Sequence, residues 1–165
     1  MLFRSQKELI KLIEDLSKYK IKNIGVDGCT LPNPLIPLKK FALAAAQLAD
    51  YKKLGEHSAL AKRIFNSCVK FPEITGGSKS INSILTKLSK GKAFIKNGAE
   101  GVFVAIIPEK KSALAVKIID GTRRAAEVAI AGLLSELKII NNEKIKKRPI
   151  KNSANQVIGS IKWIC

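Results

Sequence analysis

The stretch VFVAIIPEKKSALAVKI, residues 102–118, decides the fold of this chain. It contains two apolar runs, Val102–Ile107 and Ala113–Ile118, which are separated by the turn-forming segment Pro108-Glu109-Lys110-Lys111. Two β-rich runs joined by so short a polar segment predict a hairpin. Residues 93–95, just upstream, are a third extended candidate.

Helices are predicted on both sides of this hairpin, because apolar residues recur there at helical spacing. The first begins with Ser5 as a plausible N-cap and Glu8 three residues later. Helices grouped against antiparallel strands, without a βαβ repeat, predict an α+β fold. No repeat or linker interrupts the chain, so we expect a single domain over residues 1–165. The predicted helices span residues 5–19, 38–51, 56–69, 80–88 and 122–137.

Shorter patterns describe the remaining segments. Residues 22–26 form a β-branched run that predicts a strand. Residues 31–37 contain three prolines and predict a stiff, irregular loop. Residues 149–151 and 157–163 flank Asn152-Ser153-Ala154-Asn155 and predict a closing hairpin.

The composition indicates a folded and strongly basic protein. Hydrophobic residues make up 46% of the 165 positions, and the formal net charge is +17. A basic excess of this size raises the prospect of a polyanion partner. The only dense cluster is Lys144, Lys146, Lys147 and Arg148, and base-stacking aromatics do not alternate with the cations. A solvated lysine-rich surface is therefore favoured over a nucleic-acid site.

The cysteines and the hydropathy bear on location. Cys29, Cys68 and Cys165 are far apart and form no disulfide framework. No apolar signal segment follows Met1, and no apolar run is long enough to span a bilayer. We therefore expect a reduced, cytoplasmic protein without membrane contact.

Two segments carry candidate metal-binding and catalytic groups. In Gly25-Val26-Asp27-Gly28-Cys29, a carboxylate and a thiol follow a predicted strand, and both groups are zinc ligands. A buried structural cysteine is the alternative. Lys117 ends an apolar run just before Asp120-Gly121, which suits a proton-shuttling lysine. A strand-end lysine that extends into solvent is the alternative there.

A third group of residues could line a pocket. Asn97-Gly98-Ala99-Glu100-Gly101 places an acid between two glycines before a strand, which predicts either a plain turn or a pocket-lining loop. Arg123 and Arg124 oppose the dipole of their helix, which favours an ion-pair or anion-binding role for one of them. The candidate substrate-binding residues are therefore Glu100, Gly101, Asp120 and Arg124.

Several motifs occur together and in one order. The Gly-Val-Asp-Gly-Cys segment and the proline-rich loop up to Pro37 are followed by Pro72-Glu73, Thr75-Gly76, Gly98–Val102, Lys117-Ile118, Asp120-Gly121 and Arg124–Ala129. This ordered set resembles the C-terminal half of the rhizobial-type L-asparaginase family, from about Gly25 to the closing hairpin.

The resemblance implies a fold similar to serine β-lactamases and glutaminases, and hydrolysis of L-asparagine to L-aspartate and ammonia. It implies a Ser-x-x-Lys nucleophile pair, a second serine paired with a distant lysine, and a zinc cofactor held by two cysteines and a lysine. By this correspondence Cys29 is a zinc ligand, Asp27 is the acid beside it, and Lys117 is the distant lysine.

The same resemblance places the nucleophile segments before Gly25, and we identify none of them in residues 1–24. Ser78-Lys79 and Ser89-Lys90 have neither the spacing nor the position. We therefore expect an incomplete fold that is inactive alone, with L-asparagine or a similar amide as substrate and a missing N-terminal half or a homo-oligomer as partner. Two alternatives stay open: a small basic nucleic-acid-binding module that uses residues 144–148, and a degenerate homologue without catalysis.

Overall fold

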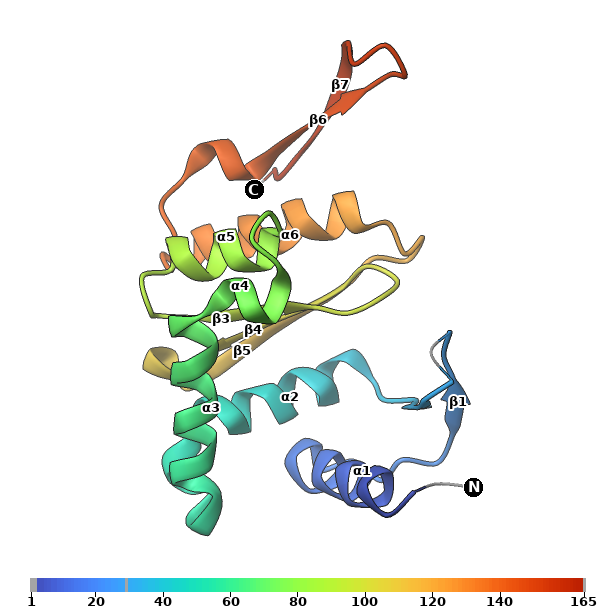
Figure 1. Ribbon diagram of the computed structural model, residues 1–165, viewed down its shortest axis with the longest axis vertical. Coiled ribbons are helices and arrows are strands. Elements are labelled where there is room, and N and C mark those ends of the chain that lie inside the picture. The colour runs from blue at the N-terminus through green and yellow to red at the C-terminus, as the bar shows by residue number, and fades with distance from the viewer. Residues whose placement is uncertain (1–2, 29, 165) are drawn as a thin grey trace.

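A computed structural model describes residues 3–28 and 30–164, and its centre is a three-stranded antiparallel sheet (Figure 1). The strands are β3 (Phe94–Asn97), β4 (Val102–Ile107) and β5 (Ser112–Lys117), in the order β3-β4-β5. The predicted hairpin is confirmed, and its turn is the 3-10 segment Pro108–Lys110.

The register of the sheet sends alternate residues of β4 to opposite faces. Phe103, Ala105 and Ile107 are buried, whereas the residues between them are half-buried. Val102 pairs with Lys117 at the end where β4 begins and β5 ends. Lys117 therefore lies on the less buried face of the sheet.

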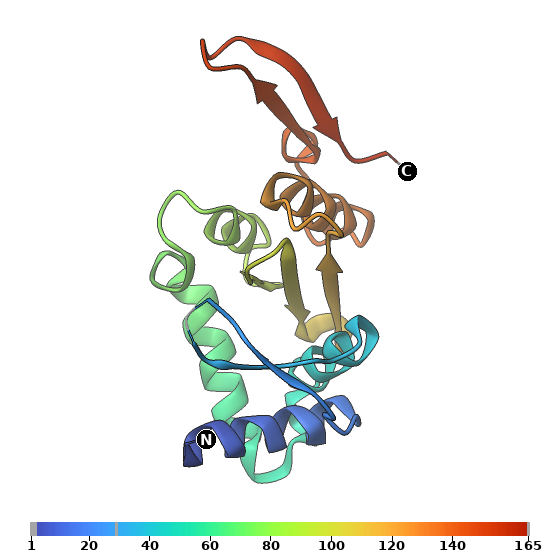
Figure 2. The same ribbon diagram turned by 90° about the vertical axis from the view of Figure 1, so that its right-hand side faces the viewer.

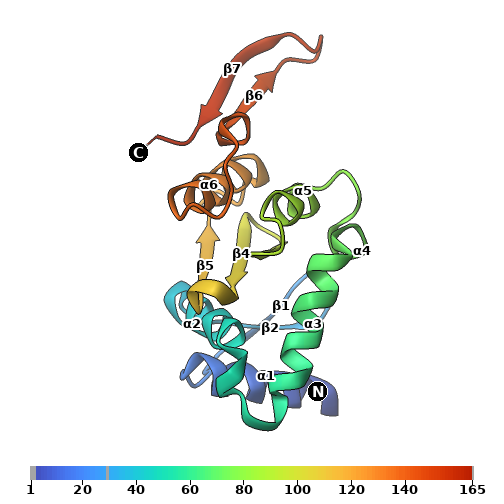
Figure 3. The ribbon, with the colours of Figure 1, turned by 90° about the vertical axis from the view of Figure 1, so that its left-hand side faces the viewer.

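Helices cover both faces of the sheet, as the predicted α+β class requires (Figures 1 and 3). On one face lie α5 (Ile81–Leu88) and α6 (Arg123–Glu136). On the other lies α2 (Leu38–Ala49), with α1 (Arg4–Ser17) packed against α2. None of the helices in residues 3–28 and 30–164 is long and apolar enough to cross a membrane.

The main core lies between the sheet and the α5–α6 layer. Apolar side chains at helical spacing on α6 meet the buried face of the sheet, and each largely leaves water. The members of this cluster are Leu85, Ala93, Ile95, Phe103, Ala105, Ile107, Val116, Ala126, Ile130, Ala131, Leu134, Ile139 and Ile140.

Helix α3 (Ser58–Lys70) runs along the side of these layers and contains no buried residue (Figure 3). The 3-10 turns Tyr51–Lys53 and Gly55–His57 precede it. As expected, α3 ends before Phe71-Pro72, but Pro72 then opens a short helix, α4 (Pro72–Gly76), that the sequence did not predict. Proline suits this first helical position because its missing N–H has no partner there anyway.

Two local predictions were wrong. The loop predicted for residues 31–37 contains a short strand, β2 (Pro32–Pro34), which pairs with β1 (Ile24–Val26). Proline is tolerated there because β2 is an edge strand of a two-stranded ladder. The N-cap of α1 is Phe3 rather than Ser5, since the Phe3 amide donates to Gln6 Oε1 at 2.8 Å.

The closing hairpin, β6 (Lys147–Lys151) and β7 (Val157–Lys162), is confirmed and projects from the body (Figure 2). A 3-10 turn, Glu143–Lys146, leads into it. Its base rests on α6, where Trp163 lies so close to Gly132 that an added Cβ would stand 2.2 Å from the indole. Arg148 also pairs with Glu127 of α6.

Candidate functional site

Two turns meet at the end of the sheet where β4 begins and β5 ends. The turn between β3 and β4 closes through Gly98 N–H to Val102 O at 2.9 Å. The turn that follows β5 closes through Gly121 N–H to Ile118 O at 3.1 Å. The Ile118 amide donates to Gly101 O at 3.1 Å, so the two turns are joined by a backbone hydrogen bond.

Glycine is required where these turns touch. Gly101 has φ +68°, and a Cβ there would stand 3.1 Å from the carbonyl carbon of Gly121. Gly121 has φ +75°, and its Cβ would stand 2.5 Å from Glu100 Oε2. Side chains would therefore force the turns apart in a backbone conformation that only glycine adopts easily. The predicted pocket residues Glu100 and Gly101 are thus brought against the segment that follows Lys117.

Asp120 organises the start of α6. Its Oδ1 accepts hydrogen bonds from the Thr122 amide at 2.9 Å and from Thr122 Oγ1 at 2.8 Å. The Thr122 amide, followed by the Thr122 hydroxyl, holds the pKa of Asp120 below its ordinary value, and the charges of Arg124 and Lys117 lower that pKa further. Asp120, Arg124 and Lys117 therefore lie close enough to interact electrostatically.

Of the two arginines, Arg123 forms the ion pair. Its Nε donates to Glu127 Oε1 at 2.8 Å, four residues along the same helix. Arg124 is exposed, and within residues 3–28 and 30–164 no acidic side chain lies within ion-pair distance of it. Arg124 is therefore the arginine that is available to an incoming anion.

Lys117 opens into a cleft of about 370 Å³ between the sheet and the start of α2. The ammonium of Lys117 donates to the carbonyl oxygen of Ile118, and its neighbours in the cleft wall are mostly apolar. The other lining residues are Asn33, Ile36, Leu38, Phe41 and Val102. Sequence reasoning missed Asn33 and Phe41, since nothing local marks an asparagine between two prolines as part of a site.

The predicted zinc ligands are only partly placed. Asp27 is exposed at the end of β1, where its carbonyl accepts from the Thr30 amide at 3.0 Å. Cys29 lies outside the described residues. Within the described part of the chain, no group of three or more His, Cys, Asp or Glu side chains could hold a metal ion. The zinc site therefore stays a prediction that the described residues neither complete nor contradict.

The serine–lysine spacing itself does occur before Gly25, at Ser17 and Lys20, which the sequence reasoning overlooked. Ser17 is fully buried and donates to Glu14 O at 3.4 Å, while Lys20 binds Glu14 Oε2 at 2.6 Å. The hydroxyl therefore faces away from solvent, and the lysine is engaged by a carboxylate.

The same spacing recurs three more times. Ser89 is buried and bonded to backbone groups, and the Ser135 hydroxyl is buried. Ser67 and Lys70 line one groove on α3, but the Lys70 ammonium lies 5.2 Å from the centroid of the Phe71 ring. None of these lysines is hydrogen-bonded to its serine in the described structure.

Together, the fold and the cleft define an α+β protein with a lysine at the mouth of a small, largely apolar cleft, bordered by glycine turns and by charges of both signs. Comparison with known families gives the particular assignment. Residues 4–163, nearly the whole chain, match the family L-asparaginase II, and the chain belongs to that family. No curated protein matches the chain.

Proposed function

We propose that this chain takes part in the hydrolysis of L-asparagine to L-aspartate and ammonia, and that the substrate binds at the Lys117 cleft. Membership of the L-asparaginase II family supports the reaction. The observation that carries the location is the meeting of Lys117 with the turns at 98–101 and 118–121, at one end of the sheet.

The charges around the cleft suit a free amino acid. L-Asparagine carries a carboxylate and an ammonium group beside its neutral amide. Arg124 is available for the carboxylate, and Glu100, which lies against Gly121, is available for the ammonium group. Asp120 keeps the start of α6 in place through Thr122. Gly101 lets the turn that carries Glu100 lie against Gly121.

Lys117 would handle the proton. In the overall reaction the amide C–N bond breaks, a water oxygen joins the acyl carbon, and the nitrogen leaves as ammonia. An attacking hydroxyl must lose its proton and the leaving nitrogen must gain one. An amine at the mouth of a largely apolar cleft, which Val102 and Phe41 also line, is placed for such a transfer.

The attacking serine is proposed to come from a different segment, supplied by an N-terminal half or by another copy. The four serines that precede a lysine at the required spacing support this, because none of them is hydrogen-bonded to that lysine in the described structure. Zinc remains a proposal from the resemblance. Asp27 and Cys29 would contribute two ligands, and the remaining ligands would come from the completing segment.

The nucleic-acid alternative has less support. Of its four cations, Lys146 binds Glu143 at 2.8 Å and Arg148 pairs with Glu127. Pairing with acids reduces the charge that these side chains offer to phosphates.

Titration of the full chain with L-asparagine, followed by amide NMR shifts, tests the proposal. We expect shifts in residues 98–102 and 117–124 that saturate in roughly the millimolar range. Arg124→Met should weaken binding about tenfold, as loss of the charge-assisted contact to the substrate carboxylate predicts. The control Lys151→Met, on the projecting hairpin, should titrate like the unaltered chain.

Two outcomes would contradict separate parts of the proposal. If L-asparagine shifts no resonance in the two turns, or Arg124→Met binds like the unaltered chain, the assigned cleft is wrong. Ammonia release by the chain alone, measured on the same samples, would overturn the external serine but leave the binding site standing.

A further inference from the structure

Helix α3 exposes an apolar strip on its outer side. Ala61, Phe65 and Val69 are half-buried toward the body, at the spacing of one helix face. Leu60, Ile64 and the adjoining Phe71 are instead exposed by 47%, 54% and 48%. Leu60 and Ile64 are one helical turn apart, and Phe71 is the C-cap residue that directly follows α3, so the three form a second apolar strip beside the half-buried one.

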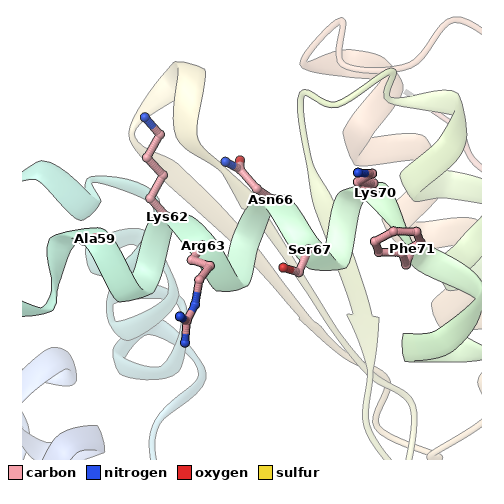
Figure 4. Close-up of a pocket in the computed structure, with 7 residues that line it drawn as sticks. All are labelled: Ala59, Lys62, Arg63, Asn66, Ser67, Lys70 and Phe71. Atoms are coloured by element: carbon pink, nitrogen blue, oxygen red, sulfur yellow. The ribbon is translucent and has the colours of Figure 1, made fainter.

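Arg63 lies about one turn from Leu60 on α3, and the Lys70 ammonium lies 5.2 Å from the centroid of the Phe71 ring, so these two cations lie beside this strip. Lys62 extends from the opposite side of the helix to Arg63, across a groove of about 470 Å³ that also includes Asn66 and Ser67 (Figure 4). Within residues 3–28 and 30–164, no acidic side chain lies within ion-pair distance of any of the three cations. The outer side of α3 therefore combines uncovered aliphatic surface with unneutralised positive charge.

We propose that this surface, the α3 face (Leu60, Arg63, Ile64, Lys70 and Phe71), docks an acidic amphipathic helix of a partner protein. Residues spaced over three turns of one helix form a ridge against which a second helix can pack. Glutamate or aspartate beside the apolar residues of the partner would neutralise Arg63 and Lys70. The charges would steer the encounter, and the aliphatic strip would supply the buried area.

Charge and side-chain type also argue against other occupants of the α3 face. A second copy of this chain carries the same net charge of +17, so two α3 faces would repel each other. A single-stranded nucleic acid would need aromatic platforms, and the strip offers only Phe71. An anionic membrane would accept a helix with cations on both flanks of its apolar strip, but on α3 one flank faces the protein body.

The α3 face is separate from the proposed asparagine site. The Lys117 cleft is lined by residues of the 33–41 segment, β4 and β5, and it shares no residue with the α3 groove. The two proposals can therefore fail independently.

Fluorescence anisotropy with synthetic helical peptides of about 16 residues tests the docking. The probe carries Leu at i, i+4, i+7 and i+11, with Glu at the flanking positions. The first control has the same composition in scrambled order, and the second replaces each Glu by Lys. We expect the Glu probe to bind the full chain at least about tenfold more tightly than either control, with a marked loss of affinity in about 0.5 M salt.

Substitutions on the chain locate the contact. Ile64→Ala should weaken the Glu probe about fivefold to tenfold, and the pair Arg63→Glu with Lys70→Glu should abolish its binding and restore binding of the Lys probe. The control Ile158→Ala removes an equally exposed aliphatic side chain from the projecting hairpin and should change nothing. Because these positions are exposed, each variant is expected to fold.

Three results would overturn the proposal. One is equal binding of the Glu probe and its scrambled control, which would indicate attraction by net charge alone. Another is unchanged binding in both α3 variants. The third is tighter, Ile64-dependent binding to phosphatidylglycerol vesicles than to the Glu probe, which would assign the surface to a membrane.

Discussion

The two faces of the β3-β4-β5 sheet are covered to very different depths. On the α6 face, large side chains such as Phe103, Ile130 and Leu134 are at most 1% exposed. On the α2 face the buried residues of the covering helix are only alanines, Ala44, Ala45 and Ala49, and the outermost helix α1 buries no residue except Ser17. The hydrophobic stabilisation is therefore concentrated on one face.

The candidate site lies on the α2 face of the sheet. The Lys117 cleft lies at the start of α2, away from the buried alanines, and its wall includes Ile36, Leu38 and Phe41. On the α6 face the same space is filled. The buried core and the Lys117 cleft therefore lie on opposite faces of one sheet.

The largest effect on stability is expected from a substitution in the core on the α6 face. Phe103→Ala should lower the free energy of unfolding by about 3–5 kcal/mol, because it removes a fully buried ring and leaves a cavity. Phe41→Ala, on the α2 face, is the matched control and should cost less than half as much, since Phe41 is half-buried. Urea unfolding of both variants measures the difference. Equal losses would show that the two faces contribute alike.

A smaller effect is expected at the turn contact that borders the cleft. Gly101→Ala should cost about 1–3 kcal/mol, because alanine at φ +68° is strained and its Cβ meets Gly121. Thermal unfolding gives the cost. Gly159→Ala is the control, since its Cβ would meet nothing closer than Ile150 at 4.0 Å. If the two substitutions lower the Tm equally, the turns are not held by that contact.

These two predictions separate what the sequence could predict from what it could not. The apolar run of β4 and the long periodic segment of α6 carry their own evidence, so both elements were predicted within a residue or two. Strand β2 was missed because its stability comes from pairing with β1, and prolines argue locally against a strand.

The candidate site was predictable only in parts. Glu100-Gly101 and Asp120-Gly121 were each identified from local glycine patterns. Their contact depends on the pairing of β4 with β5, which no local pattern specifies. Asn33 and Phe41 join Lys117 only after α2 packs on the sheet. The sequence therefore identified chemical groups, and the tertiary contacts decided which of them are neighbours.

The smallest effect concerns pH at the edge of the cleft. The pKa of Asp120 is lowered in the folded chain, so its carboxylate stabilises the fold above the unfolded pKa of about 3.9, and this contribution is lost as the pH falls through the lower folded value. A carbon-13 NMR titration should therefore give a midpoint below the ordinary value. Thr122→Val, which removes one donor, should raise that midpoint. An ordinary midpoint, or no change in Thr122→Val, would contradict the assigned hydrogen bonds.

The close packing of Trp163 on Gly132 has a practical consequence. Trp163 is the only tryptophan of the chain, and it lies at the junction between the projecting hairpin and α6. The intrinsic fluorescence of the protein therefore reports on the contact between this hairpin and α6. If the β6–β7 hairpin detaches while the α6 face stays folded, the tryptophan emission shifts to the red and the far-ultraviolet circular dichroism changes little. The hairpin and the rest of the protein can therefore be followed separately without any added label.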